Sequence, residues 1–206
     1  MTHCRHRVAD VLCGRSGLKR ESGFSIIELM IVLVIASILV AAAGPGFMDL
    51  LGNNRTISEV YTLRATLNNA RTEALARRAP VVVCPTTDGL ACADSDDWST
   101  GYMVFVDTDD NNIADSSNPD EEVIQFENGP RSVDLAFSNS DNRVRFGAQG
   151  SALGSEGTFT FCDGRGVEHA RGLIVNPVGN LSAATDTDTP EDLVVNDRND
   201  DNVVCS

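Results

Sequence analysis

The chain begins with a polar segment and then becomes almost entirely apolar. The apolar run starts at Phe24 and ends near Ala43, and about twenty such residues are enough for a helix to cross the hydrocarbon core of a bilayer. One carboxylate, Glu28, lies inside this run. An ionised group at that depth is costly, so such a residue is expected to serve a function and to have a partner of opposite charge. The pattern predicts a membrane-spanning helix over residues 24–45.

A second helical pattern follows the sequence Gly44-Pro45-Gly46. Pro45 is expected to kink or locally melt the helix, because proline removes a backbone hydrogen bond. Beyond it, apolar residues recur at steps of three and four up to about Arg78, and Pro80 should end the helix. This predicts an amphipathic helix over residues 46–79 that lays one apolar stripe on a sheet. Its charged residues are expected to face outward, and they are Arg55, Glu59, Arg64, Arg71 and Arg77.

The period changes to that of short β-strands from Val81 onward. Clusters of Gly, Asn, Asp and Pro separate the β-rich runs, which is typical of an antiparallel β domain. The expected strands are Val81–Cys84, Tyr102–Asp107, Val123–Phe126, Val133–Ser138, Arg143–Phe146, Thr158–Cys162, Gly172–Asn176 and Leu193–Val195. The predicted fold is therefore α+β, with a long N-terminal helix packed on an antiparallel sheet or sandwich over residues 80–206.

Charge is divided along the chain. Five cations and two carboxylates give residues 1–23 a net charge of +3, so the total of −14 leaves −17 on residues 24–206. Positive charge before a membrane span places the N-terminus in the cytoplasm. The β domain is then expected in the periplasm, on the far side of the inner membrane. A surface this acidic repels phosphate backbones unless its arginines gather in one patch, and no such gathering is visible, which argues against nucleic-acid binding.

Residues suited to catalysis are few. Beyond residue 23 the only histidine is His169, in a short turn between predicted strands, and no serine lies in a nucleophile elbow. We therefore expect no enzymatic activity and no cofactor. Cys4 and Cys13 lie near two histidines in the first 23 residues, but their spacing fits no zinc site well.

Four cysteines remain in the part expected to be exported, namely Cys84, Cys92, Cys162 and Cys205. An even number in an oxidising compartment indicates disulfides, and four cysteines allow three pairings. We favour Cys84–Cys92 across a short loop and Cys162–Cys205 near the C-terminus. The second bond would close a loop of about forty residues and contribute on the order of 3–4 kcal/mol in the chain-entropy model.

The N-terminal layout resembles the class III signal of type IV pilins and type II secretion pseudopilins. The resemblance rests on Lys19-Arg20, on Ser22-Gly23 before the apolar run, and on Phe24 and Glu28. It implies that a prepilin peptidase removes residues 1–23 between Gly23 and Phe24 and methylates the new amine of Phe24. Glu28 becomes the fifth mature residue and supplies a counter-charge to the α-amine of a neighbouring subunit. Pro45 matches a proline that pilins commonly carry.

The β domain is similar to the FimT/FimU/GspH group of minor pilins and pseudopilins. The segment from Trp98 to Asp107 matches "W-x-x-G-(aromatic)-x-V-F-x-D", residues 146–150 match "F-x-x-x-G", and residues 158–162 match "T-F-x-x-C". The resemblance implies a structural minor pilin that initiates or caps a type IV pilus. Its partners would be other major and minor pilins and the inner-membrane assembly platform. A GspH-like pseudopilin of type II secretion is the first alternative.

A DNA-binding pilin of natural transformation is the second alternative. Members of the FimT type that bind DNA carry a Gly-Arg-x-Arg motif, and the corresponding positions here read Gly179-Asn180-Leu181-Ser182. Both arginines are missing, and phosphate contacts are mostly made by Lys and Arg. We therefore disfavour this function.

One acidic stretch has the alternating oxygen ligands of a calcium loop. The candidate ligands are Asp107, Asp109, Asn111 and Asp115. Asn118 stands where a bidentate Glu is expected, so the closing ligand is absent. An acidic turn between two strands is the other interpretation, and we favour it.

Overall fold

The computed structural model describes residues 23–115, 117–130 and 132–205, with the backbone alone for residues 42–45. The predicted leader, apart from Gly23, lies outside the described residues. The chain divides into two compact units, Met1–Pro45 and Gly46–Ser206. Each unit is described separately below.

One long helix, α1 (Ile26–Arg77), belongs to both units. Its backbone stays helical through residues 44–46, where a kink or local melting was expected at Pro45, and the boundary between the units falls at the same place. α1 ends because Arg78 adopts a left-handed backbone conformation, with φ of 55°, and Pro80 follows. The predicted end of the helix near Arg78 is confirmed.

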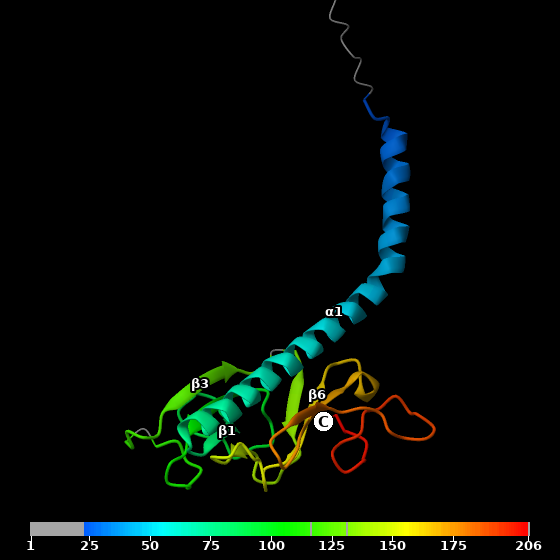
Figure 1. Cartoon of the computed structure of the whole chain (residues 1–206). Helices are drawn as coiled ribbons and strands as arrows, with labels where there is room; N and C mark the ends of the chain where they lie inside the picture. The colour runs from blue at the N-terminus through cyan, green and yellow to red at the C-terminus, as the bar shows by residue number, and fades with distance from the viewer. Residues whose placement is uncertain (1–22, 116, 131, 206) are drawn as a thin grey trace, which may run out of the picture. The chain divides into compact units, whose positions relative to one another are not determined.

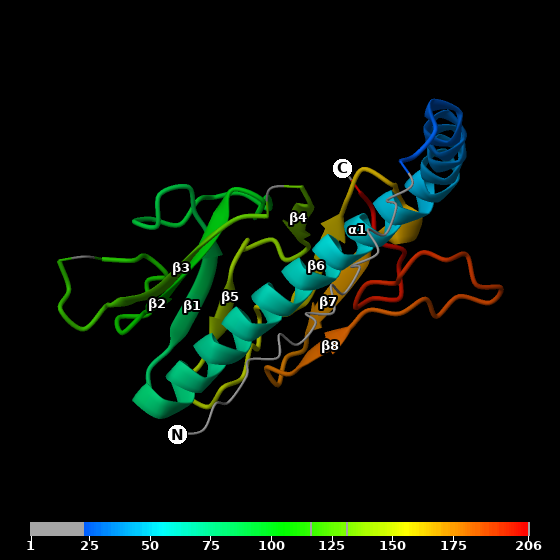
Figure 2. The same ribbon diagram turned by 90° about the horizontal axis from the view of Figure 1, so that it is seen from above.

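The second unit contains two four-stranded sheets (Figures 1 and 2). The first sheet has the order β3-β2-β1-β5 and the second has the order β4-β6-β7-β8. All strand pairs are antiparallel. The strands are β1 (Val81–Pro85), β2 (Gly101–Val106), β3 (Val123–Asn128), β4 (Asp134–Phe137), β5 (Val144–Phe146), β6 (Gly157–Cys162), β7 (Arg171–Val175) and β8 (Leu181–Ala183). A short 3-10 helix, η1 (Val167–His169), joins β6 to β7.

Seven of the eight expected strands correspond to strands of the structure, and one does not. Leu193–Val195 is not a strand, because Leu193 has a φ of 69° and donates its N–H to the Asp186 carboxylate instead of to a neighbouring strand. The eighth strand is β8, which pairs with β7 and which the sequence pattern did not reveal. The α+β class with an antiparallel β domain is confirmed.

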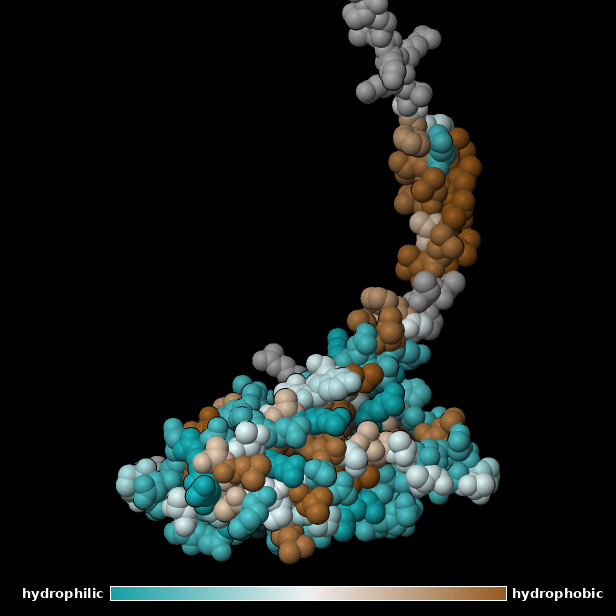
Figure 3. All heavy atoms as spheres, in the orientation of Figure 1, coloured by the Kyte–Doolittle hydropathy of each residue, from teal (hydrophilic) through white to brown (hydrophobic). Residues whose placement is uncertain are grey.

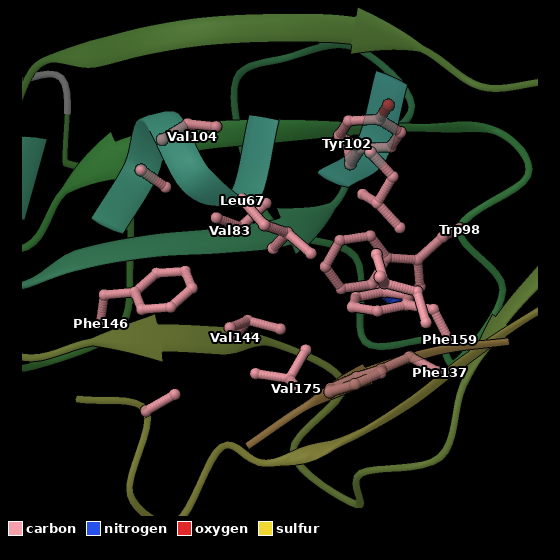
Figure 4. Close-up of a cluster of buried hydrophobic side chains, with 14 of the residues drawn as sticks. Leu67, Val83, Trp98, Tyr102, Val104, Phe137, Val144, Phe146, Phe159 and Val175 are labelled. Carbon is pink, nitrogen blue, oxygen red and sulfur yellow. The ribbon is translucent and has the colours of Figure 1, made fainter. Parts of the chain in front are cut away.

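The core lies between α1 and both sheets. One face of the helix is completely buried there, at Leu63, Leu67, Ala70 and Ala74. This is the apolar stripe expected from the sequence. Figure 2 shows α1 running across strands of the two sheets, and Figure 4 shows Leu67 among side chains from them. The helix therefore joins the two sheets through a single core.

Trp98 lies at the centre of an aromatic group in this core (Figure 4). Its ring meets Phe159 edge to face with centroids 4.7 Å apart, and Phe137 stacks on Phe159 at 4.2 Å. Phe105 is equally buried but lies in a second cluster, with Val82 and Met103. Trp98 and Phe105 are both fully buried.

Two disulfides restrain the β domain, and they are the two favoured from the sequence. Cys84 in β1 bonds Cys92, with Cα atoms 5.6 Å apart. Cys162 at the end of β6 bonds Cys205, with Cα atoms 5.7 Å apart. The second bond fastens the C-terminal segment to the second sheet.

Candidate functional site

The N-terminal unit presents apolar side chains on every side of its helix. Phe24 is 79 % exposed and Val40 is 72 % exposed, and the large apolar residues between them are exposed too. Figure 3 shows these side chains as a hydrophobic surface. A helix that is apolar all round needs lipid or other helices to cover it.

No single helix of the described chain has the length and apolarity of a membrane span. The parts of α1 on either side of residues 42–45, Ile26–Ala41 and Gly46–Arg77, meet those requirements only when they are taken together.

The residues expected to be processed lie at the start of this unit. Gly23 and Phe24 are exposed and precede α1, so the peptide bond between them is not part of the helix. Glu28 lies in the first helical turn and is exposed. A carboxylate in the first turn is favoured by the helix dipole. The side chain of Pro45 lies outside the described residues.

Hydrogen bonds around an Asp163–Arg165 ion pair connect the loop after β6 to the domain helix, which is the part of α1 in the second unit. Asp163 follows β6, and its Oδ2 accepts hydrogen bonds from Thr56 Oγ1 at 3.0 Å and from Arg165 Nη2 at 2.6 Å. Arg165 Nη1 donates to the carbonyl of Asp49 at 3.0 Å. We call these four residues the latch. It joins the β6–η1 loop to α1 only a few residues after the unit boundary.

The electrostatics of the latch follow from these contacts. The hydrogen bond from Arg165 lowers the pKa of Asp163 to about 2, against the opposing effect of burial. The same bond raises the pKa of Arg165. Arg165 lies so close to the helix that a Cβ at Gly52 would meet its Nε at 2.9 Å. A side chain at this point of α1 would have to displace the Arg165 guanidinium.

A second arginine connects the middle of the domain helix to two loops. Arg71 donates from Nε to the Gly150 carbonyl at 2.9 Å, from Nη1 to Asn180 Oδ1 at 2.9 Å and from Nη2 to the Val178 carbonyl at 3.1 Å. We call this set the Arg71 clamp. The expectation that Arg71 faces outward is wrong, because the acceptors of the β7–β8 turn and of the loop after β5 draw the side chain inward. Sequence periodicity gave no sign of these acceptors.

The clamp also bears on the loop that was compared with the DNA-binding motif. Gly179 has a φ of 79°, and a Cβ at this position would collide with the carbonyl of Gly150. Asn180 is already engaged by Arg71. The loop is thus a tight turn held by α1, and its own residues 179–182 carry no cation.

The acidic loop after β2 brings together only part of the expected calcium ligands. Asp107 and Asp109 lie within reach of one another and of Glu121, whereas the Asp115 carboxylate is not part of this group. The Asn111 side chain donates its amide N–H to Asp109 Oδ2 at 2.8 Å. Glu121 was missed because it lies three residues beyond the position at which a calcium loop closes. Asp115 instead donates its backbone N–H to Glu121 Oε2 at 3.1 Å.

A positive charge already faces this loop. Arg145 of β5 forms ion pairs with Asp107, at 3.5 Å, and with Asp110. Asp107 is fully buried, and its two oxygens accept the backbone N–H groups of Asn111 and Asn112. A guanidinium beside the most buried carboxylate opposes a cation at the same place. The residues present fit calcium poorly, and they fit an acidic turn stabilised by Arg145 well.

His169, the histidine considered for catalysis, ends η1 and is exposed. The neighbouring hollow is lined by residues that include Glu168, Arg165 and Arg171, and none of its described lining residues is a serine, threonine or cysteine nucleophile.

Two family models match the chain. The first, described as Type II transport protein GspH, matches residues 59–179, and the second, described as Prokaryotic N-terminal methylation motif, matches residues 18–44. Among curated proteins, no sequence match is significant.

Two solved structures are similar to the chain, both of the type IV minor pilin FimU of Pseudomonas aeruginosa strain PAO1. Each is 20 % identical to it, with TM-scores of 0.49 and 0.48. The alignments cover 64 % and 62 % of this chain, and 90 % and 91 % of the two FimU chains. The match to the first family model spans more than half of the sequence, from the domain helix to the β7–β8 turn. The chain therefore belongs to the GspH family, the group of minor pilins and pseudopilins.

Proposed function

We propose that this chain is a structural minor pilin that initiates or caps the assembly of a type IV pilus. The observation that carries the proposal is the N-terminal helix, exposed and apolar on every side, with one carboxylate four residues after Phe24. The methylation-motif match over residues 18–44 includes this carboxylate and supports the same role.

The proposed mechanism begins with processing in the inner membrane. A prepilin peptidase cuts between Gly23 and Phe24, and it methylates the α-amine of Phe24. The helix stays in the bilayer, with the β domain in the periplasm. The assembly platform then moves the apolar helix from lipid into a bundle of pilin helices, where its side chains pack on those of other subunits instead of lipid.

Glu28 sets the register of this bundle. An unpaired carboxylate in a bilayer costs about 2.5–3.5 kcal/mol at the helix centre on insertion scales. The α-amine of a neighbouring subunit removes much of that cost when it lies beside the carboxylate. The pairing is satisfied only at one axial offset between neighbouring helices, so it selects that offset from the many that apolar packing permits.

The β domain provides the outer surface of the subunit. The latch and the Arg71 clamp fasten α1 to the β domain at two separate places, through Asp163 and through Arg71. With the buried helix stripe, they hold the domain helix rigidly on the two sheets.

A minor pseudopilin of type II secretion is a second candidate, favoured by the printed description of the matching family. It would use the same processing, the same helix and the same pairing of Glu28. Nothing in the β7–β8 turn favours a DNA receptor, since Asn180 and Ser182 stand where that motif carries arginines.

The test replaces Glu28 with alanine in the full chain, as the sole copy in cells that assemble filaments. Glu28→Ala should leave the protein in the membrane, because it removes a polar group from hydrocarbon. Incorporation into sheared filaments, measured by immunoblotting, should fall strongly. Ser37→Ala is the matched control, because it removes a polar group from the same helix whose hydroxyl bonds only the Val34 carbonyl. Normal incorporation of Glu28→Ala would refute the pairing mechanism.

A further inference from the structure

A hollow of about 400 Å³ opens on the β domain where three segments meet. They are residues 111–112 in the loop after β2, residues 141–145 around the start of β5, and residues 153–155 before β6. Small-molecule pockets in proteins typically measure roughly 300–1,000 Å³. The proposed role as a pilin uses none of the side chains in this hollow.

Two arginines form one wall of the hollow. Arg143 lies directly before β5 and Arg145 lies within it, so their side chains fall on the same face of the sheet. Val144 and Phe146 alternate with them and are buried in the core beneath α1. The two arginine side chains therefore lie on the face of the first sheet that points away from that core.

The same arginines hold the opposite wall in place. Arg143 donates from Nη1 to the carbonyl of Asn112 at 3.1 Å and from Nε to the carbonyl of Asp141 at 2.8 Å. The backbone N–H of Asn112 donates to Asp107 Oδ2 at 3.3 Å, and Arg145 pairs with the same carboxylate oxygen at 3.5 Å. The walls are thus fixed before a ligand arrives, which lowers the entropic cost of binding.

Three polar groups of the hollow lack a hydrogen-bond partner among the residues that the structure describes. Asn112 Oδ1 is a buried acceptor without a donor, and Arg145 Nε is a buried donor without an acceptor. Ser155 lines the hollow and is only 7 % exposed, and its hydroxyl takes part in none of the hydrogen bonds found in the described chain. Buried polar groups in folded proteins are almost always hydrogen-bonded, so these are the groups that a bound molecule would satisfy.

The groups around the hollow include both donors and acceptors. Guanidinium groups only donate, the Asn112 amide oxygen and the Asp141 carboxylate only accept, and the Ser155 hydroxyl does both. An anion would satisfy only the donors, and it would meet Asp141 in a domain whose residues 80–206 carry a net charge of −18. A cation would satisfy only the acceptors and would lie beside two arginines. A molecule with several hydroxyl groups fits the whole set, because each hydroxyl donates and accepts at once.

We propose that this hollow binds a neutral carbohydrate, whose hydroxyls pair with Asn112, Arg143 and Ser155. Leu153 lines the same hollow and is 80 % exposed, so it offers an apolar surface to the C–H groups of a sugar ring. The interaction is binding alone, with no bond formed or broken. The inference goes beyond the proposed pilin role, because it gives the β domain a ligand that is not another subunit.

The experiment measures binding of three probes, the methyl glycosides of glucose, galactose and mannose, to the full chain by NMR. The probes share one kind of ring and differ in the orientation of single hydroxyls. The chain is held in micelles of a zwitterionic detergent, because detergents with sugar head groups would compete. At least one probe should receive saturation transfer from the protein, with a dissociation constant on the order of 1 mM, as expected of a ligand with about a dozen heavy atoms.

The test variant combines Asn112→Gly with Ser155→Ala. Asn112 has a φ of 58°, a conformation that glycine adopts freely, and neither substitution removes a side-chain hydrogen bond found in the described chain. The variant should therefore fold normally and bind the sugar about tenfold more weakly, because two hydrogen bonds to the ligand are lost. The matched control is Asn142→Gly with Ser140→Ala, in a neighbouring turn whose two residues do not line the hollow and where Asn142 has a φ of 53°. This control should bind like the unmodified chain.

Trp98 fluorescence reports the folding of every variant, since the chain has a single tryptophan and its side chain is fully buried. The inference is overturned if none of the three glycosides binds at about 10 mM, ten times the expected constant. Equal binding by the test variant and the unmodified chain, or an equal loss in the control, would overturn it too. Tighter binding of inorganic phosphate than of any glycoside would replace it with an anion site. None of these results bears on the proposed pilin role, which is tested separately at Glu28 and at the processed N-terminus.

Discussion

The latch makes a quantitative prediction about acid stability. Asp163 is held by Arg165 and Thr56, and only 8 % of its side chain is exposed. Its pKa is about 2, compared with an ordinary value of 3.8. A difference of nearly two pKa units corresponds to about 2 kcal/mol of folding free energy, taken as an order of magnitude.

The sign follows from the direction of the shift. Because the pKa of the folded state is lowered, the contribution is fully present above about pH 4–5, where the unfolded chain is also ionised. It is lost as the pH falls from there to about 2. The substitution Asp163→Asn keeps the shape and removes the charge. It should lower the free energy of unfolding by about 2 kcal/mol at pH 7 and flatten the decline below pH 5.

The assay is urea unfolding of the full chain in detergent, followed by the fluorescence of Trp98. The control is Asp94→Asn, because Asp94 is exposed and a surface change of this kind is usually within about 0.5 kcal/mol. Equal stability of Asp163→Asn and the unmodified chain at pH 7 would refute the reasoning. So would an unchanged acid profile, since it would mean that another group controls the loss of stability.

Three further predictions concern single features of the β domain. Arg71→Met should lower the free energy of unfolding by about 1–3 kcal/mol, measured in urea, because it removes the clamp's three hydrogen bonds; a loss below about 0.5 kcal/mol would contradict the clamp. The unmodified chain should bind DNA no more tightly than about 10⁻⁴ M at physiological salt, and Asn180→Arg with Ser182→Arg should raise binding in a salt-dependent way. Micromolar binding by the unmodified chain, measured by fluorescence anisotropy, would instead favour the DNA receptor. Calcium at about 1 mM should leave the urea midpoint unchanged, because Arg145 already pairs with the carboxylates of the acidic loop; a clear calcium-dependent stabilisation would contradict this interpretation.

Much of the architecture is readable from residue periodicity. The buried stripe from Leu63 to Ala74 repeats at helical spacing, and the strands from Val81 onward are short and rich in β-branched and aromatic residues. Helical spacing and strand composition are local features of the chain, so they can be recognised in a single sequence. The pairing of the cysteines was favoured for a similar reason, since Cys84 and Cys92 are only eight residues apart.

The errors arise where distant parts of the chain decide local structure. Leu193–Val195 has the composition of a strand, but the Leu193 N–H donates a hydrogen bond to the Asp186 carboxylate instead of to a neighbouring strand. β8 (Leu181–Ala183) is only three residues long, so it is recognised by its pairing with β7 and not by its own sequence pattern. Arg71 looks like a surface residue until the loops at Gly150 and Val178 supply its acceptors. These acceptors lie more than seventy residues away along the chain, beyond the reach of any local pattern.

The N-terminus of the protein in cells tests the central claim most directly. Intact mass and fragment spectra should be recorded for protein extracted from membranes that contain an active prepilin peptidase. The pilin account predicts a chain that begins at Phe24, carries a methyl group on the α-amine and lacks residues 1–23. A chain that keeps its leader, or one that is cut anywhere other than between Gly23 and Phe24, would contradict it.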